Sequence, residues 1–158
     1  MKEETFSLLT KEIITAEDLY FFIEQINVIK KYLFADITKG SLFERIKGKV
    51  DERIRLKLEE LEKKNLLPQE LIEKSVFFEE LKKYLHSLPQ IKLEVAFLPN
   101  KTFLTKIKKW LEETINREMV LDILVNPEIV GGVNIEYQGK YFGWSLAEKL
   151  RDTKLLKQ

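Results

Sequence analysis

The sequence lacks cysteine altogether and has a single histidine, His86, among its 158 residues. The absence of thiols excludes a disulfide, a thiolate zinc site, an iron–sulfur cluster and a cysteine nucleophile. One histidine without cysteine also argues against a transition-metal site. We therefore expect neither a bound metal nor another cofactor.

Net charge and long apolar runs are scarce as well. The 27 lysines and arginines nearly balance the 26 aspartates and glutamates, so no strong field attracts nucleic acid or an anionic membrane. No apolar run approaches the roughly 20 residues that span a bilayer. The acidic start, residues 1–6, has no signal-peptide core. We interpret the chain as a soluble protein of a bacterium-like cytoplasm.

Three features that resemble parts of active sites have simpler interpretations. His86 lies near the end of an expected helix, where a positive charge is favourable, and catalysis would also require an orienting carboxylate and a nucleophile. The adjacent carboxylates Glu59-Glu60 point about 100° apart on a helix and do not converge on one substrate. Gly131-Gly132 precedes an expected strand, whereas a phosphate-binding loop precedes a helix. These residues predict a protein that is not an enzyme.

Residues 1–88 have the apolar spacing of helices. The first stripe follows Thr15-Ala16-Glu17-Asp18, which fits a capping box. A second stripe, from Phe43 to Leu61, predicts one helix with a narrow apolar seam and a wide charged face. A third run follows Pro68, which suits the first turn of a helix because that position needs no N–H donor. The pattern predicts a bundle with about four helices.

From residue 91 the period becomes that of strands. Ile91, Leu93 and Val95 alternate with polar residues, and the alternation continues to Phe97. Gln138-Gly139 predicts a hairpin turn between two later strands. The expected order is a strand over 91–97, a helix over 101–116, a strand over 119–125, two strands over 133–137 and 140–144, and a helix from Ser145, which Ser145 and Glu148 would cap.

These patterns predict an α+β fold with two domains. An N-terminal helical bundle over residues 1–88 precedes a β-α-β-β-β-α domain over residues 91–158. The first two strands flank a helix, so we expect them to be parallel.

A basic stretch raises the alternative of a small RNA-binding α+β protein. Its residues are Lys101, Lys106, Lys108 and Lys109, beside Phe103 and Trp110. RNA-binding sheets use exposed aromatic side chains of this kind. However, Phe103, Ile107 and Trp110 share one helical face, which predicts core, and most of the lysines fall on the other face.

One stretch of the second half is distinctive in the order and spacing of its residues. It comprises Asn126-Pro127, Glu128, two aliphatic residues, Gly131-Gly132, alternating apolar residues, Gly139, Ser145 and Lys149-Leu150. This order resembles the C-terminal motif of the delta subunit of F-type ATP synthases, called the oligomycin-sensitivity-conferring protein in mitochondria. The resemblance covers residues 91–152, and the helical region before it is shorter than the family's six-helix bundle. Asn126 stands where the family has an acidic residue.

The resemblance implies a non-catalytic peripheral-stalk (stator) subunit of a proton-translocating F-type ATP synthase. Residues 1–88 would bind the N-termini of the alpha subunits of the catalytic F1 head, and residues 91–158 the C-terminus of the b-subunit stalk, so that rotor torque is resisted. The protein would lie on the cytoplasmic face of the bacterial plasma membrane, the cell inner membrane, with no nucleic-acid partner and no direct small-molecule substrate.

The resemblance also nominates particular residues. The structural motif comprises Pro127, Gly131, Gly132, Gly139, Ser145, Lys149 and Leu150. The candidate partner contacts are Phe22, Ile23 and Ile26 in the first domain and Trp144, Leu146 and Leu150 in the second. Ordinary core packing is the alternative for each contact.

A related alternative is the E-like stator subunit of V- or A-type ATPases, whose C-terminal region also has Gly-Gly before a strand. That family begins with one very long helix, so a first helix unbroken past residue 60 would favour it. Pro68 and the expected breaks near residues 36–41 argue against it.

Overall fold

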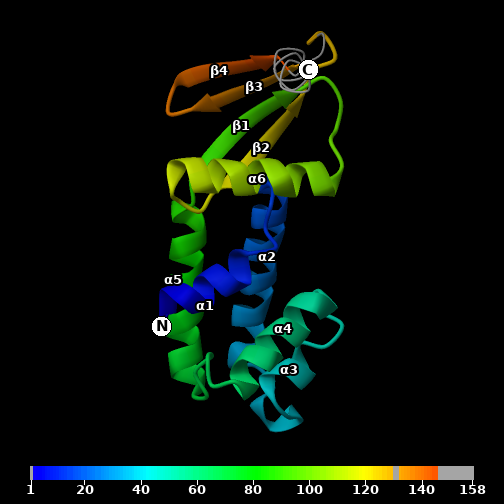
Figure 1. Ribbon diagram of the computed structural model, residues 1–158. Coiled ribbons are helices and arrows are strands. Elements are labelled where there is room, and N and C mark those ends of the chain that lie inside the picture. Colours follow the sequence, from blue (N-terminus) through cyan, green and yellow to red (C-terminus); the bar gives the residue numbers. More distant parts are fainter. Residues whose placement is uncertain (1, 130–131, 146–158) are drawn as a thin grey trace. The chain divides into compact units, whose positions relative to one another are not determined.

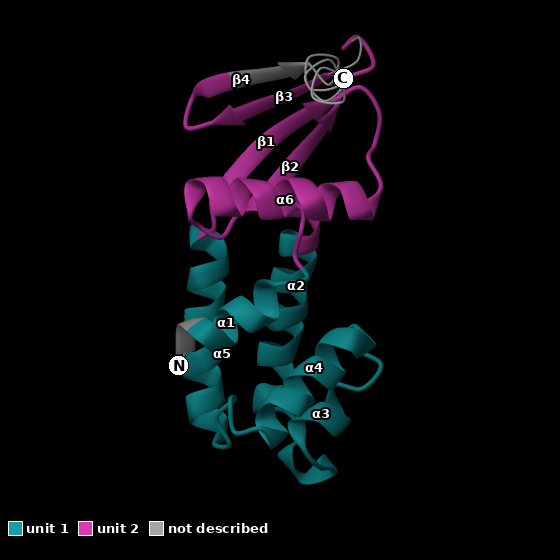
Figure 2. Ribbon diagram, in the orientation of Figure 1, with its two compact units in different colours: residues 1–12, 19–87 teal, residues 13–18, 88–158 magenta. Residues whose placement is uncertain are grey.

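The computed structural model describes residues 2–129 and 132–145. The chain divides into two compact units, which Figure 2 distinguishes by colour. The helical unit comprises residues 1–12 and 19–87, and the sheet unit comprises residues 13–18 and 88–158. Helices and a small sheet together confirm the predicted α+β fold class.

The helical unit is built around two long helices (Figure 1). Its elements are α1 (Lys2–Thr10), most of α2 (Ala16–Leu33), the 3-10 helix η1 (Ile37–Lys39), α3 (Leu42–Arg45), α4 (Glu52–Lys63) and α5 (Leu71–Ser87). Helices α2 and α5 are linked by an ion pair between Lys30 and Glu79. Phe6 of α1 packs edge-on against Phe77 of α5, with ring centroids 5.3 Å apart. These contacts surround a core of large apolar side chains: Leu19, Ile26, Ile29, Leu33, Ile46, Leu58, Phe78, Leu81 and Leu85.

Helix boundaries in this unit differ from the sequence prediction at three places. The single helix expected from Phe43 to Leu61 is wrong, because Gly48 has a φ of 73° and Asp51 caps a new helix, α4. Pro68 precedes α5, which begins at Leu71, so its expected place in the first turn is also wrong. The sequence analysis assigned no separate helix to the residues of α1, although it expected the whole region to be helical. The capping box before α2 is confirmed, since Asp18 N donates to Thr15 Oγ1 and Thr15 N to Asp18 Oδ2.

The sheet unit contains a four-stranded sheet in the order β2-β1-β3-β4. Its strands are β1 (Gln90–Val95), β2 (Val120–Val125), β3 (Gly132–Tyr137) and β4 (Lys140–Ser145), and its helix is α6 (Lys101–Ile115). The expected parallel pairing of β1 with β2 is confirmed, and β3 lies antiparallel to both β1 and β4. The first strand ends at Val95, so the expected extension to Phe97 is wrong.

Helix α6 lies on one face of this sheet (Figure 1) and closes its core. The alternating residues Ile91, Leu93 and Val95 of β1 point into that core, as expected from the period of two. Ile107 and Trp110 pack against them from α6. The hairpin turn is confirmed, because Gln138 and Gly139 both have positive φ, 51° and 73°, as a two-residue turn of the mirror-image type requires.

A short segment from the beginning of the chain completes the sheet unit. Ile14 is buried in the core, and its carbonyl accepts a hydrogen bond of 2.9 Å from Leu121 N of β2. Thr15 forms a parallel bridge with Leu121 and then starts α2 as its capping residue. No sequence pattern predicted this pairing, which brings residues 13–18 into the sheet unit.

Candidate partner-binding surfaces

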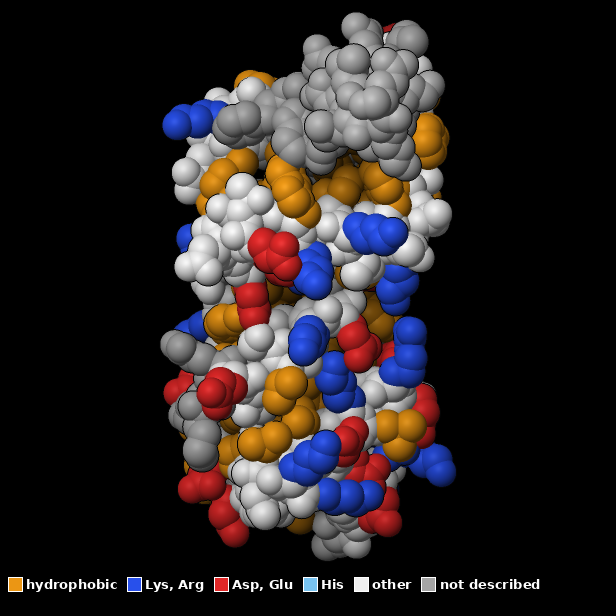
Figure 3. Space-filling view, viewed as in Figure 1, with side chains coloured by type: hydrophobic (Ala, Val, Ile, Leu, Met, Phe, Trp, Pro, Cys, Tyr) orange, Lys and Arg blue, Asp and Glu red, His pale blue; other side chains and the backbone are white. Residues whose placement is uncertain are grey.

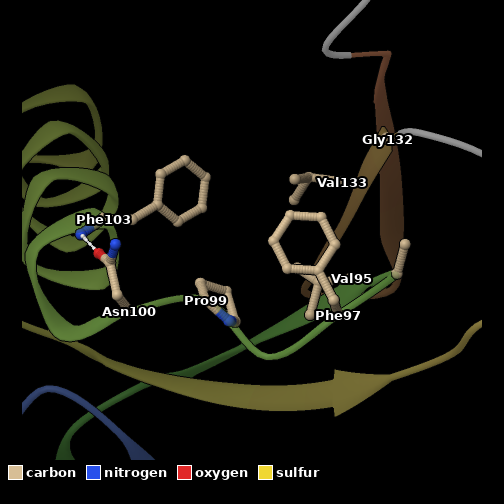
Figure 4. A pocket seen from close by; sticks show the side chains of 8 residues that line it. Val95, Phe97, Pro99, Asn100, Phe103, Gly132 and Val133 are labelled. Atoms are coloured by element: carbon tan, nitrogen blue, oxygen red, sulfur yellow. Dashed lines mark hydrogen bonds between the residues drawn. The ribbon is translucent and has the colours of Figure 1, made fainter.

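An apolar groove of about 210 Å³ opens in the sheet unit at the N-terminal end of α6 (Figure 4). The rings of Phe97 and Phe103 lie on opposite sides of it, and Val95 and Val133 lie on the same side as Phe97 (Figure 4). Among the described residues that line it, Asn100 has the one polar side chain, and its Oδ1 accepts from Phe103 N at 2.9 Å and so caps α6. The groove therefore suits apolar side chains, with almost nothing to orient a polar ligand.

Phe97 is the most exposed aromatic side chain that lines this groove. The loop after β1 holds it outside the core with 75% of its surface exposed. A large aromatic side chain left in water beside an apolar groove is typical of a docking surface.

The turn after β2 is held by hydrogen bonds of Asn126. Ile129 N donates to Asn126 O at 3.2 Å and Glu128 N to Asn126 Oδ1 at 3.1 Å, which places Pro127 at the second position of a tight turn. The strand accordingly ends at Val125, just before this turn.

The same Asn126 also reaches the neighbouring strand. Its side-chain amide donates to Glu94 Oε1 at 2.7 Å, and the amide of Asn134 on β3 donates to Glu94 Oε2 at 3.1 Å. These two hydrogen bonds, that of Asn126 first, lower the pKa of Glu94 from its ordinary value. An acidic residue at position 126 would place a second carboxylate beside Glu94 and would have no side-chain N–H to donate to it. The amide of Asn126 is therefore the better partner for Glu94 in this chain.

The candidate contact residues of the helical unit are buried within it. Phe22, Ile23 and Ile26 all lie in the core, Ile26 completely so. Their immediate neighbours Tyr20 and Phe21 on α2 are exposed. The helical spacing of apolar residues, from which these three residues were chosen, also marks the core face of a helix. It gave no indication that the neighbouring aromatic residues Tyr20 and Phe21 are exposed.

A second groove, of about 430 Å³, lies between α1 and α4 of the helical unit. Leu8, Leu61 and Leu66 line it, and Leu8 is exposed. Its rim carries both charges: Lys57 pairs with Glu12 at 3.1 Å, and Lys64 with Glu60. An apolar floor with a mixed charged rim is suited to an amphipathic helix.

Most of the nominated residues of the motif lie in or beyond the last strands. Gly132 starts β3, and Gly139 closes the hairpin. Trp144 and Ser145 are the last two residues of β4, paired with Val133 and Gly132. Gly131, Leu146, Lys149 and Leu150, and with them the helix expected from Ser145, lie outside the described residues.

Charge on the molecule is dispersed. Figure 3 shows basic and acidic side chains interspersed over the visible face. Of the lysines considered for RNA binding, Lys108 pairs with Glu112 at 2.9 Å and Lys109 with Glu113 at 3.9 Å, while Trp110 packs against the core. His86 is exposed in the last turn of α5. Within residues 2–129 and 132–145, no three acidic or histidine side chains gather to hold a metal ion, and no helix combines the length and apolarity needed to cross a bilayer.

The fold and its surfaces define a two-unit α+β protein with an apolar groove in each unit. Residues 26–155 match the family model of the ATP synthase delta (OSCP) subunit, and the chain belongs to this family. The family is one of non-catalytic peripheral-stalk subunits of the ATP synthase. No curated protein matches the sequence significantly.

Proposed function

We propose that this protein is the stator link of a proton-translocating F-type ATP synthase, joining the F1 head to the b-subunit stalk so that rotor torque is resisted. The observation that carries the proposal is the family match, which extends over residues 26–155 and so covers most of both units. Such a link needs two separate binding surfaces, and each unit offers one apolar groove.

The helical unit is proposed to bind the N-termini of the alpha subunits. The groove between α1 and α4, lined by Leu8 and Leu61, has the apolar floor and charged rim that an amphipathic helix needs. Phe22, Ile23 and Ile26 lie in the core of this unit, and Tyr20 and Phe21 are the exposed residues nearest to them in sequence.

The sheet unit is proposed to bind the C-terminus of the b subunit. The region around Trp144, Leu146 and Leu150 remains the proposed contact, and the groove at Phe97 adjoins β3, the partner strand of β4. In this role the protein would lie on the cytoplasmic face of a bacterial plasma membrane, attached through the complex.

An E-like stator of a V- or A-type enzyme would have had one helix past residue 60. The first two helices instead end at Thr10 and Leu33. This arrangement supports the F-type assignment, in agreement with the family match.

The test uses the full chain and two labelled peptides, one from the N-terminus of the cognate alpha subunit and one from the C-terminus of b. We expect the unaltered chain to bind both peptides. Leu8→Asp should weaken binding of the alpha peptide, and Phe97→Asp should weaken binding of the b peptide. Each affinity should fall by about tenfold or more, because an apolar anchor is lost. Ile72→Asp, at an exposed apolar position of α5 outside both grooves, should change neither affinity. Retention of neither peptide by the unaltered chain would refute the proposal.

A further inference from the structure

Strand β2 forms one edge of the sheet, on the side opposite β4 (Figure 1). Successive backbone N–H groups of a strand point to opposite sides, and two hydrogen bonds show which side each set takes. Val120 N donates to Pro89 O at 3.0 Å, toward β1, whereas Leu121 N donates to Ile14 O at 2.9 Å, away from β1. The odd-numbered residues of β2 therefore present their N–H and C=O groups to the outer edge.

Beyond Leu121 this edge has donors and acceptors to offer. Thr15 forms its bridge with Leu121, and the chain then turns away from the sheet into α2 at Ala16. Ile123 and Val125 are the next odd-numbered residues, and within the described ranges no hydrogen bond reaches their outward N–H and C=O groups. Another extended backbone is the ligand that matches a row of donors and acceptors at this spacing.

The edge of β2 also lacks the features that usually protect an edge strand. Such strands carry lysine, proline or a bulge, which prevent pairing with other chains. Strand β2 contains neither lysine nor proline, and its one-to-one register with β1 has no bulge. It instead leaves Leu124 60% and Val125 42% exposed. These two side chains point to opposite faces of the sheet, so an added strand would cover both of them.

Asp122 gives the edge a chemical preference. Leu121 and Ile123 pack into the core beneath α6, so the side chain of Asp122 lies on the other face of the sheet. In the described part of the chain, no hydrogen bond or ion pair reaches its carboxylate, because Lys92, its neighbour on β1, pairs with Glu136 at 3.6 Å. An incoming strand would therefore gain from a basic residue beside Asp122 and from apolar residues beside Ile123.

We propose that the edge of β2 from Asp122 to Val125 binds an extended segment of another protein, which adds to the sheet as a further strand and alternates basic with apolar residues. This edge lies on the opposite side of the sheet from β4 and shares no residue with the groove at Phe97. The proposal therefore goes beyond the stator function and does not rest on it.

The test uses the full chain, labelled for NMR, and a blocked synthetic hexapeptide in which lysine alternates with valine. In the chain alone, we expect the amides of Ile123 and Val125 to exchange readily with solvent. Saturating peptide should slow their exchange by about tenfold or more, because both N–H groups become hydrogen-bonded. A peptide in which glutamate replaces lysine should bind more weakly, and Asp122→Asn should remove this difference.

Methylation of the peptide nitrogens distinguishes strand addition from apolar adhesion. Alternate N–H groups of an added strand point to β2 and to solvent. N-methylation of one alternate set should therefore abolish binding, and N-methylation of the other set should leave it unchanged. The set that is required also gives the direction of the added strand.

Val125→Pro tests the edge from the side of the protein. It removes one outward donor and no hydrogen bond to β1, and proline is tolerated where the N–H faces outward from an edge strand. We expect it to weaken binding of the lysine–valine peptide by about tenfold or more, whereas the control Val125→Ala, which keeps the N–H, should weaken it by about threefold or less. Both variants should bind the alpha and b peptides as the unaltered chain does, so this proposal and the stator proposal can fail separately.

Four results would each overturn the proposal. The first is a full chain that does not bind the lysine–valine peptide, and the second is protection of the amides of Ile123 and Val125 in the chain alone. The third is binding that responds equally to methylation of either alternate set. The fourth is self-association that Val125→Pro abolishes, because the edge would then belong to a second copy of the chain.

Discussion

Arg45 donates hydrogen bonds to the C-terminal end of α2, and the substitution Arg45→Met measures how much these hydrogen bonds stabilise the helical unit. Its guanidinium donates to the carbonyl oxygens of Tyr32 at 2.7 Å, of Leu33 at 3.3 Å and of Ala35. Helix α2 ends at Leu33, so the carbonyls of Tyr32 and Leu33 belong to its last turn, which has no intrahelical donors, and that of Ala35 lies just beyond it. Only 8% of Arg45 is exposed, so water replaces the guanidinium poorly.

The expected loss follows from these contacts. A hydrogen bond from a charged donor contributes about 1.5–3 kcal/mol, and a positive charge at a helix C-terminus adds up to about 1 kcal/mol. One of the three bonds is long, and methionine retains part of the apolar stem. We therefore expect Arg45→Met to lower the free energy of unfolding by about 3 kcal/mol. Arg45→Lys should recover only a minor part, because an ammonium group cannot span three carbonyls.

Urea unfolding of the full chain, followed by circular dichroism, measures this loss, and hydrogen exchange of the α2 amides shows whether it lies at that helix. Arg53→Met is the control, since its side chain is 83% exposed in its ion pair with Asp51, and a change within about 0.5 kcal/mol is expected. A loss below about 1 kcal/mol for Arg45→Met would refute the argument that the buried guanidinium secures the helix end.

Two further predictions concern the sheet unit. The side-chain amides of Asn126 and Asn134 lower the pKa of Glu94 from 4.5, so the ionised Glu94 stabilises the fold above pH 4.5, and this stabilisation is lost as the pH falls through the lowered pKa. An NMR titration should give a midpoint for Glu94 below 4.5, and Asn126→Ala should raise it. A midpoint that Asn126→Ala leaves unchanged would contradict the hydrogen-bond assignment. Leu93→Ala, at a completely buried position of β1, should lower the free energy of unfolding by about 2–5 kcal/mol in thermal unfolding. Leu124→Ala, at an exposed position of β2, should cost less than about 0.5 kcal/mol, and equal losses would contradict the assignment of Leu93 to the core.

The sheet unit was predictable because its signals are local. Alternation of Ile91, Leu93 and Val95 determines which face of β1 is buried, and Gln138-Gly139 determines the hairpin turn through its positive φ angles. The end of β1 was misplaced, because the alternation continues to Phe97 in the sequence although the strand already ends at Val95.

The helical unit was harder because its decisive contacts join residues distant in sequence. The apolar seam from Phe43 to Leu61 continues across the break between α3 and α4, so periodicity alone could not reveal it. Asp51 caps α4, and its N–H donates at 2.7 Å to Gln25 on α2, a contact that no local pattern encodes.

The candidate surfaces were only partly visible in the sequence for the same reason. Helical period marked Phe22 and Ile26, but it cannot separate a partner contact from core, and both residues are buried. The groove at Phe97 forms between the loop after β1, which leads directly into α6, and β3, which is distant from both in sequence. The pairing of Ile14 with Leu121 joins residues that are even further apart.

The most direct test of the stator assignment removes this protein from the cells that make it and asks whether the F1 head stays on the membrane. The account predicts that the head is released into the soluble fraction, that ATP-driven proton pumping by the membranes is lost, and that adding back the purified full chain restores both. A head that remains attached, with proton pumping undiminished, would contradict it.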